Sequence, residues 1–235
     1  MTGWSAATIG LQCVDAEGRP AAMDNGNALV QRESSVRVRH IVGNILVSLF
    51  YGFFLYTSIR YWLKTGSFVG IGLVACNTLV VGCLLTRKNA SAVTESVQNW
   101  ILASLIQVAP LLLRPAGSPM SILAFISSAG QVAGLALMIA SLMTLNRSIG
   151  VVAANRGIKT RGPYAWIRHP LYAGEILFDI SFLASNWSYA NGVLVLVLTL
   201  AQVVRALQEE TFLLRDQVYA LYRATVTYRL VPRVF

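Results

Sequence analysis

The stretch MSILAFISSAGQVAGLALMIASLMTL, residues Met120–Leu145, contains no charged side chain. About 20 predominantly apolar residues are enough to cross the hydrocarbon core of a bilayer as an α-helix. The stretch is also rich in small residues, among them Gly130 and Gly134, which let membrane helices approach one another closely. It therefore predicts a transmembrane helix that packs tightly within a helical bundle.

Similar apolar stretches lie on both sides of this segment. They run over about residues 41–59, 67–86 and 96–113 before it, and over 171–187 and 189–204 after it. The polar residues Asn186, Ser188 and Asn191 separate the last two stretches and predict the turn of a helical hairpin. We predict an all-α polytopic membrane protein with about six transmembrane helices, followed by a cytoplasmic helical tail.

The composition agrees with a membrane protein. Of the 235 residues, 55% are hydrophobic and 12% are charged, about half the charged fraction of a typical soluble domain. The formal net charge is +9, which cytoplasmic loops and anionic lipids explain, so no nucleic-acid partner is expected. Cys13, Cys76 and Cys83 lack metal-ligand or disulfide spacing, so we expect no metal site.

The distribution of basic residues predicts the orientation. With six crossings and a cytoplasmic N-terminus, sixteen Lys and Arg fall inside and only Arg60, Lys64 and Arg114 fall outside. Both termini are then cytoplasmic. Arginine outnumbers lysine sixteen to three, which suggests a GC-rich bacterial genome, and we expect an integral protein of a bacterial inner membrane.

Three regions follow from this topology. Residues 1–40 are predicted to form a cytoplasmic N-terminal tail, and residues 41–145 four transmembrane helices. Residues 146–235 are predicted to form a cofactor-binding loop, the helical hairpin and a C-terminal cytoplasmic segment, which together make the catalytic region.

Polar residues with functional potential begin at residues 155–174, NRGIKTRGPYAWIRHPLYAG. Gly162-Pro163 is a turn signal, and Pro170 can open a helix because its missing N–H is not needed there. Arg168 and His169 then precede a helix N-terminus, where backbone N–H groups and the helix dipole favour an anion.

Four acidic residues accompany this segment. Glu175 and Asp179 are four residues apart, on one face of an apolar helix, where charged groups need a polar cavity or a partner such as Arg205. Glu209 lies four residues after Arg205, so an ordinary helical ion pair accounts for it. Glu210 points about 100° away from Glu209 around the helix and is predicted to face the pocket.

Taken together, these residues resemble the isoprenylcysteine carboxyl methyltransferase family and related membrane methyltransferases, including phospholipid N-methyltransferases. The resemblance covers about residues 130–235. It rests on Gly162-Pro163-Tyr164, on Arg168-His169-Pro170-Leu171-Tyr172 with Gly174, on Arg205 with Glu209-Glu210, and on Tyr219 and Tyr222.

The resemblance implies a cytoplasm-facing site for S-adenosylmethionine and a lateral opening for a lipophilic or lipid-modified acceptor among the membrane lipids. The side chains implied to line the cofactor site are Tyr164, Arg168, His169, Tyr172, Glu209 and Glu210. Arg168 would bind the methionyl carboxylate, and one of the glutamates the amino group or ribose hydroxyls.

The acceptor could be a carboxylate, an amine or a hydroxyl. A carboxylate needs only a cation such as Arg205 to hold it, whereas an amine or hydroxyl needs a base, for which His169 and Glu210 are the candidates. Glu175, Asp179 and Arg205 are the candidate acceptor-binding residues.

Two other functions remain open at this point. The first is an NADPH-dependent membrane reductase of the steroid-reductase type, which also binds a nucleotide among helices. The second is a non-catalytic membrane scaffold or transport component, in which Glu175 and Asp179 would form an ion or proton path.

Overall fold

The apolar stretches form the helices of the protein. The computed structural model describes residue 45 and residues 47–235, except residues 89, 91, 95, 117–120, 151 and 153, so the predicted tail 1–40 lies outside the described residues. A helix over residues 47–65 is followed by α2 (Phe68–Leu85), α3 (Val97–Val108) with the 3-10 turn η1 (Ala109–Leu112), and α4 (Ser121–Leu145). The hairpin α5 (Pro170–Ser185) and α6 (Tyr189–Leu213) and the short α7 (Gln217–Thr225) complete the helices.

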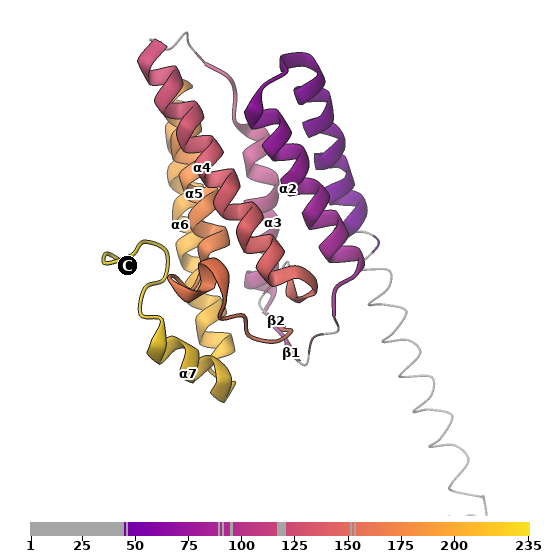
Figure 1. Ribbon diagram of the computed structural model, residues 1–235, viewed down its shortest axis with the longest axis vertical. Helices are drawn as coiled ribbons and strands as arrows, with labels where there is room; N and C mark the ends of the chain where they lie inside the picture. Colours follow the sequence, from indigo (N-terminus) through magenta and orange to yellow (C-terminus); the bar gives the residue numbers. More distant parts are fainter. Residues whose placement is uncertain are drawn as a thin grey trace, which may run out of the picture. The chain divides into compact units, whose positions relative to one another are not determined.

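Helix α5 lies between α4 and α6 (Figure 1). Helix α2 packs against α4, while α3 contacts α6. The segment between α4 and α5 holds two short 3-10 turns, η2 (Asn146–Ser148) and η3 (Gly162–Ala165). Figure 1 shows this segment, the two short strands and α7 at one end of the helices, which we call the loop end.

The predicted hairpin is confirmed, and its turn is held by the polar residues that predicted it. Ser188 caps α6 by accepting a hydrogen bond from the Asn191 N–H. Asn191 is almost completely buried, and its side-chain amide donates to the carbonyls of Arg114 and Asn186 at 2.7 and 2.6 Å. One asparagine thus joins the hairpin turn to the chain that leaves η1.

Three helical segments in the described part of the chain have the length and hydropathy of membrane spans. They are Phe68–Leu85, Ile122–Ser148 and Tyr189–Leu213. Two other predicted spans are short in the structure: within Val97–Leu112 the α-helical geometry ends before Pro110, and α5 has 16 residues. The protein is an integral membrane protein, while six crossings stay a prediction.

Two details of the structure differ from the prediction. Residues Ala92–Val93 (β1) and Ala154–Asn155 (β2) form a two-residue antiparallel pair. Two residues are too few to produce an alternating hydrophobic pattern, so the sequence carries no signal for this pair. In addition, α6 continues nine residues beyond the predicted end at residue 204, and therefore carries Arg205, Glu209 and Glu210.

The contact between α4 and α5 depends on glycines. A Cβ built on Gly134 would lie 2.8 Å from the carbonyl oxygen of Gly174 and 2.9 Å from the backbone nitrogen of Phe178. A Cβ on Gly174 would likewise lie 2.9 Å from the carbonyl oxygen of Gly134. Because these neighbours are backbone atoms, they cannot yield by rotating, so the two helices can approach this closely only without side chains.

We therefore expect Gly134→Ala to lower the free energy of unfolding by about 1–3 kcal/mol, as overpacking does elsewhere. Thermal unfolding in detergent measures the loss. Gly82→Ala is the matched control, because it also lies in an apolar helix but a Cβ there meets nothing within 4 Å. Equal stability of the two variants would contradict the packing role of Gly134.

Candidate active site

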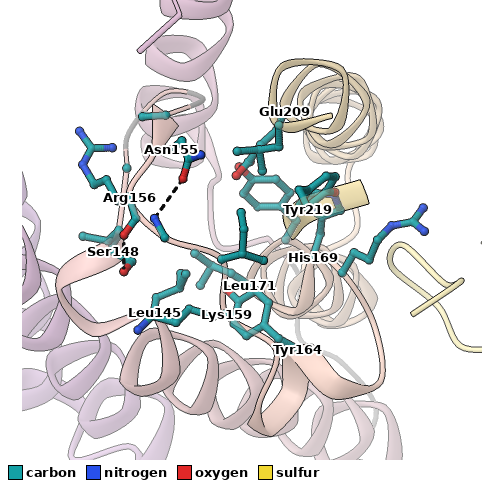
Figure 2. A pocket seen from close by; sticks show the side chains of 18 of the residues that line it. Leu145, Ser148, Asn155, Arg156, Lys159, Tyr164, His169, Leu171, Glu209 and Tyr219 are labelled. Atoms are coloured by element: carbon teal, nitrogen blue, oxygen red, sulfur yellow. Dashed lines mark hydrogen bonds between the residues drawn. The ribbon is translucent and has the colours of Figure 1, made fainter. Parts of the chain in front are cut away.

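A cavity lies at the loop end, where the chain between α4 and α5 meets α5, α6 and α7. Its empty volume is about 950 Å³, part of which is open to solvent. Figure 2 shows Tyr164, His169, Glu209 and Tyr219 around the cavity, with Asn155 and Arg156 from the loop on another side.

Most of the predicted site residues line this cavity, although they come from distant parts of the sequence. The predicted residues in its wall are Tyr164, Arg168, His169, Tyr172, Glu175, Arg205 and Glu209. Glu210 and Asp179 were also predicted for the site but are not in the wall. The structure thus turns Glu209, rather than Glu210, toward the cavity.

Glu210 is instead the centre of a buried ion-pair cluster. Its carboxylate accepts hydrogen bonds from Arg168 Nε at 2.8 Å and from Arg229 Nε at 3.1 Å, and lies 3.2 Å from His169 Nε2. The side chains of Arg168 and Glu210 are each only 4% exposed. A buried charge needs such partners, and here the protein itself supplies them.

Arg168 and His169 connect the start of α5 to the chain after α7. Arg168 Nη1 donates to the carbonyls of Val226 and Thr227, both at 3.0 Å. The backbone N–H groups of Arg168 and His169 donate to the carbonyls of Tyr228 and Arg229, both at 2.9 Å. Residues 226–229 therefore occupy the backbone N–H groups just before α5, where the sequence predicted an anion site.

A second polar group lies on the cavity side of α5 and α6. Tyr172 Oη donates to Glu209 Oε2 at 2.6 Å, and the His169 ring stacks on the Tyr172 ring with 5.5 Å between centroids. The Arg205 guanidinium lies over the Tyr172 ring, 5.0 Å from its centroid, in a cation–π contact. Tyr172 therefore organises this wall of the cavity through its hydroxyl group and its ring.

Tyr219 lies in the cavity wall and carries a buried hydroxyl group. The residue is 3% exposed, and its Oη has no hydrogen-bond partner among the described residues. Burial, and then the charges of Glu210 and Glu209, raise the pKa of the Tyr219 phenol, so it is neutral and able to donate. A buried hydroxyl without a partner is costly, which indicates that a ligand or water completes it.

Tyr164 and Tyr222 also line the cavity. Tyr222 Oη donates to the Tyr164 carbonyl at 2.7 Å. Burial, and then Glu209, raise the pKa of the Tyr164 phenol well above its usual range. Both aromatic side chains line the cavity and offer flat apolar surface, together with an uncharged hydroxyl on Tyr164.

The loop wall contains residues that were not assigned to the site from the sequence, including Ser148, Asn155, Arg156 and Lys159. Asn155 is held by a hydrogen bond from its amide to Asp216, the residue that caps α7. Burial, and then the neighbouring charge of Arg87, lower the pKa of Arg156 to about 10, which leaves it charged at neutral pH. A basic loop before a helix looks the same in sequence whether it faces lipid headgroups or a cavity, so its role could not be assigned.

The chain was compared with protein families, curated sequences and solved structures. Residues 123–215 match the profile of the isoprenylcysteine carboxyl methyltransferase (ICMT) family. A solved structure of the eukaryotic intramembrane Ras methyltransferase ICMT is similar at 18% identity, with a TM-score of 0.47, covering 88% of this chain and 87% of that one. No curated protein sequence matches the chain. The profile match confirms the resemblance to the ICMT family and supports a membrane methyltransferase.

Proposed function

We propose that this ICMT-like membrane protein transfers a methyl group from S-adenosylmethionine to a lipophilic acceptor. The observation that carries the proposal is the cavity at the loop end. Its walls combine aromatic faces with a buried Tyr219 hydroxyl that has no partner among the described residues and with the carboxylate of Glu209, and Glu209 lies within the residues 123–215 that match the family profile.

The residues of the cavity fit the parts of this cofactor. Tyr164, Tyr219 and Tyr222 offer surfaces on which a flat base could lie, and Tyr219 Oη could bond a polar atom of the cofactor. Glu209 could accept hydrogen bonds from an ammonium group or from ribose hydroxyls. When bound, S-adenosylmethionine supplies an electrophilic methyl group on a positively charged sulfur.

The protein's own contribution is then alignment and exclusion of water. Arg168 and Glu210 act here as positioning residues, because their hydrogen bonds fasten residues 226–229 over the start of α5. This differs from the role expected for Arg168 as the carboxylate ligand, since four of its five N–H donors already have protein acceptors.

The decisive experiment is ligand-dependent thermal unfolding of the purified protein in detergent. S-adenosylhomocysteine at 100 times its dissociation constant should stabilise the protein by about 2.7 kcal/mol, whereas NADPH should not. A shift with NADPH would favour a reductase instead. No shift with either compound would remove the basis for a methyltransferase.

A further inference from the structure

We propose that Arg147 and Arg156 form a binding site for the phosphate group of an anionic membrane phospholipid. They belong to a group of basic residues at the loop end, completed by Arg87 and Lys88, which we call the basic cluster. The lipid is bound there and not converted, so the site does not depend on the proposed methyltransferase reaction. Three features support it: the position of the cluster, the hydrogen bonds that hold its arginines, and the donors that these bonds leave.

The basic cluster lies where two apolar helices end. Helix α2 ends at Leu85, two residues before Arg87, and the turn η2 that follows α4 contains Arg147 and contacts α2. Both α2 and α4 belong to segments with the hydropathy of membrane spans, and both end at the loop end (Figure 1). Leu85 and Met143, near these ends, are 64% and 66% exposed. Exposed apolar side chains next to basic groups suit the acyl chains and the headgroup of a phospholipid.

Hydrogen bonds to neighbouring backbone carbonyls hold both arginines in place. Arg147 Nε donates to the Thr86 carbonyl at 2.6 Å, and Arg156 Nε donates to the Lys88 carbonyl at 3.1 Å. The Lys88 N–H in turn donates to the Arg147 carbonyl at 2.8 Å. Because the two acceptor carbonyls are only two residues apart, at most about 7 Å of chain separates them. The two guanidinium groups are therefore anchored to adjoining points of the chain, as two ligands of one phosphate group need to be.

These bonds leave hydrogen-bond donors without acceptors. In the part of the chain that the structure describes, no carboxylate forms an ion pair with Arg147 or Arg156. Both side chains donate to described residues only through Nε, and Arg156 Nη1 is buried without a partner among them. The Nη groups of a planar guanidinium match the spacing of phosphate oxygens and bind them in pairs. An anion from outside the protein would therefore complete the hydrogen bonding of both arginines.

The electrostatics of the basic cluster also favour an anion. Burial, and then the charge of Arg87, lower the pKa of Arg156, and burial lowers the pKa of Arg87 as well. The folded protein therefore disfavours these two positive charges relative to water. A phosphate group beside them would offset this by adding negative charge at short range. At a membrane surface, anionic phospholipids present phosphate at high local concentration, and basic pockets beside membrane helices bind their headgroups.

A lipid at this position would also fasten one wall of the cavity. Arg156 belongs to the loop wall, and its backbone carbonyl accepts a hydrogen bond from Ser148 Oγ at 3.1 Å. Figure 2 shows Arg156 across the cavity from Glu209 and Tyr219, so the lipid is bound on the opposite side from the residues proposed to bind the cofactor. The headgroup therefore anchors the loop wall to the membrane surface.

The first test adds phospholipids to the purified protein in detergent and follows thermal unfolding. We expect dioleoylphosphatidylglycerol to raise the melting temperature. Dioleoylphosphatidylcholine and inorganic phosphate, each at the same phosphate concentration, should add little. These three arms use the unmodified protein, so they distinguish an anionic lipid from any phospholipid and from a free anion even if a variant fails to fold. No shift with phosphatidylglycerol, or an equal shift with phosphatidylcholine or with inorganic phosphate, would overturn the proposal.

A pair of double variants then locates the site. In Arg147→Gln with Arg156→Gln, the phosphatidylglycerol concentration that gives half of the shift should rise about 10- to 30-fold, the factor that two basic residues beside anionic lipid contribute. The matched control is Arg161→Gln with Arg223→Gln, which removes two charges at the same end. Neither control residue lines the cavity, and neither side chain bonds to another described residue. Unchanged lipid binding in the first double variant, or an equal loss in both, would contradict a site at Arg147 and Arg156.

Discussion

Glu210→Ala is expected to lower the free energy of unfolding by about 3–5 kcal/mol, the range found when one partner of a buried ion pair is removed. The reason is that Arg168, whose side chain is 4% exposed, would keep its charge without a carboxylate beside it. Arg229 and His169 would lose the same partner. Thermal or denaturant unfolding in detergent measures the effect.

A second variant separates this explanation from a general packing defect. Arg168→Met combined with Glu210→Gln removes both charges, so the double variant should be less destabilised than Glu210→Ala alone. If Glu210→Ala unfolds at the same temperature as the unmodified protein but no longer responds to S-adenosylhomocysteine, Glu210 is a ligand-binding residue and the positioning role is wrong.

The arrangement of helices was largely predictable because membrane spans need long apolar stretches. The hairpin turn was predictable from Asn186, Ser188 and Asn191, which the structure uses as caps and side-chain bridges. The early end of α3 before Pro110 and the extension of α6 to Leu213 were not predicted. Both depend on where a helix meets its neighbours, which a hydropathy pattern does not record.

The site was predictable as a set of residues but not as a set of roles. The sequence placed Arg168 and His169 together with the two glutamates that follow about 40 residues later, and the structure brings these side chains together. Glu209 and Glu210 differ only by the rotation between adjacent helical positions. Which of them faces the cavity depends on how α6 is turned against α5 and on residues 226–229, and no local pattern contains that information.

The unpartnered hydroxyl of Tyr219 illustrates the same limit. Tyr219 was one of the residues that carry the family resemblance but was not predicted to line the site, and its lack of a partner among the described residues is a property of the folded chain. A tyrosine on a short amphipathic helix is more often a packing residue, and Tyr219 also packs against Leu213, Tyr222 and Val226. Only the three-dimensional arrangement shows that this packing residue also places its hydroxyl group in the cavity wall.

Glu209→Gln is expected to weaken binding of S-adenosylhomocysteine by about 10- to 100-fold, because hydrogen bonds to a charged group contribute about 1.5–3 kcal/mol. The substitution keeps the size of the side chain and an oxygen that can accept from Tyr172 Oη. Stability without ligand should therefore change little, in contrast to Glu210→Ala. Titration calorimetry or the ligand-dependent melting shift measures the affinity.

The comparison between these adjacent acidic residues discriminates between the two assignments. If Glu209 faces the ligand and Glu210 holds the fold, the first variant loses affinity at nearly constant stability, and the second loses stability. Tyr172→Phe serves as a further control, since it removes the hydroxyl group that positions Glu209 but leaves its charge, and should cost less affinity than Glu209→Gln. Unchanged affinity in Glu209→Gln would mean that the carboxylate does not contact the cofactor, and the cofactor would then have to bind through the tyrosines and the basic loop wall.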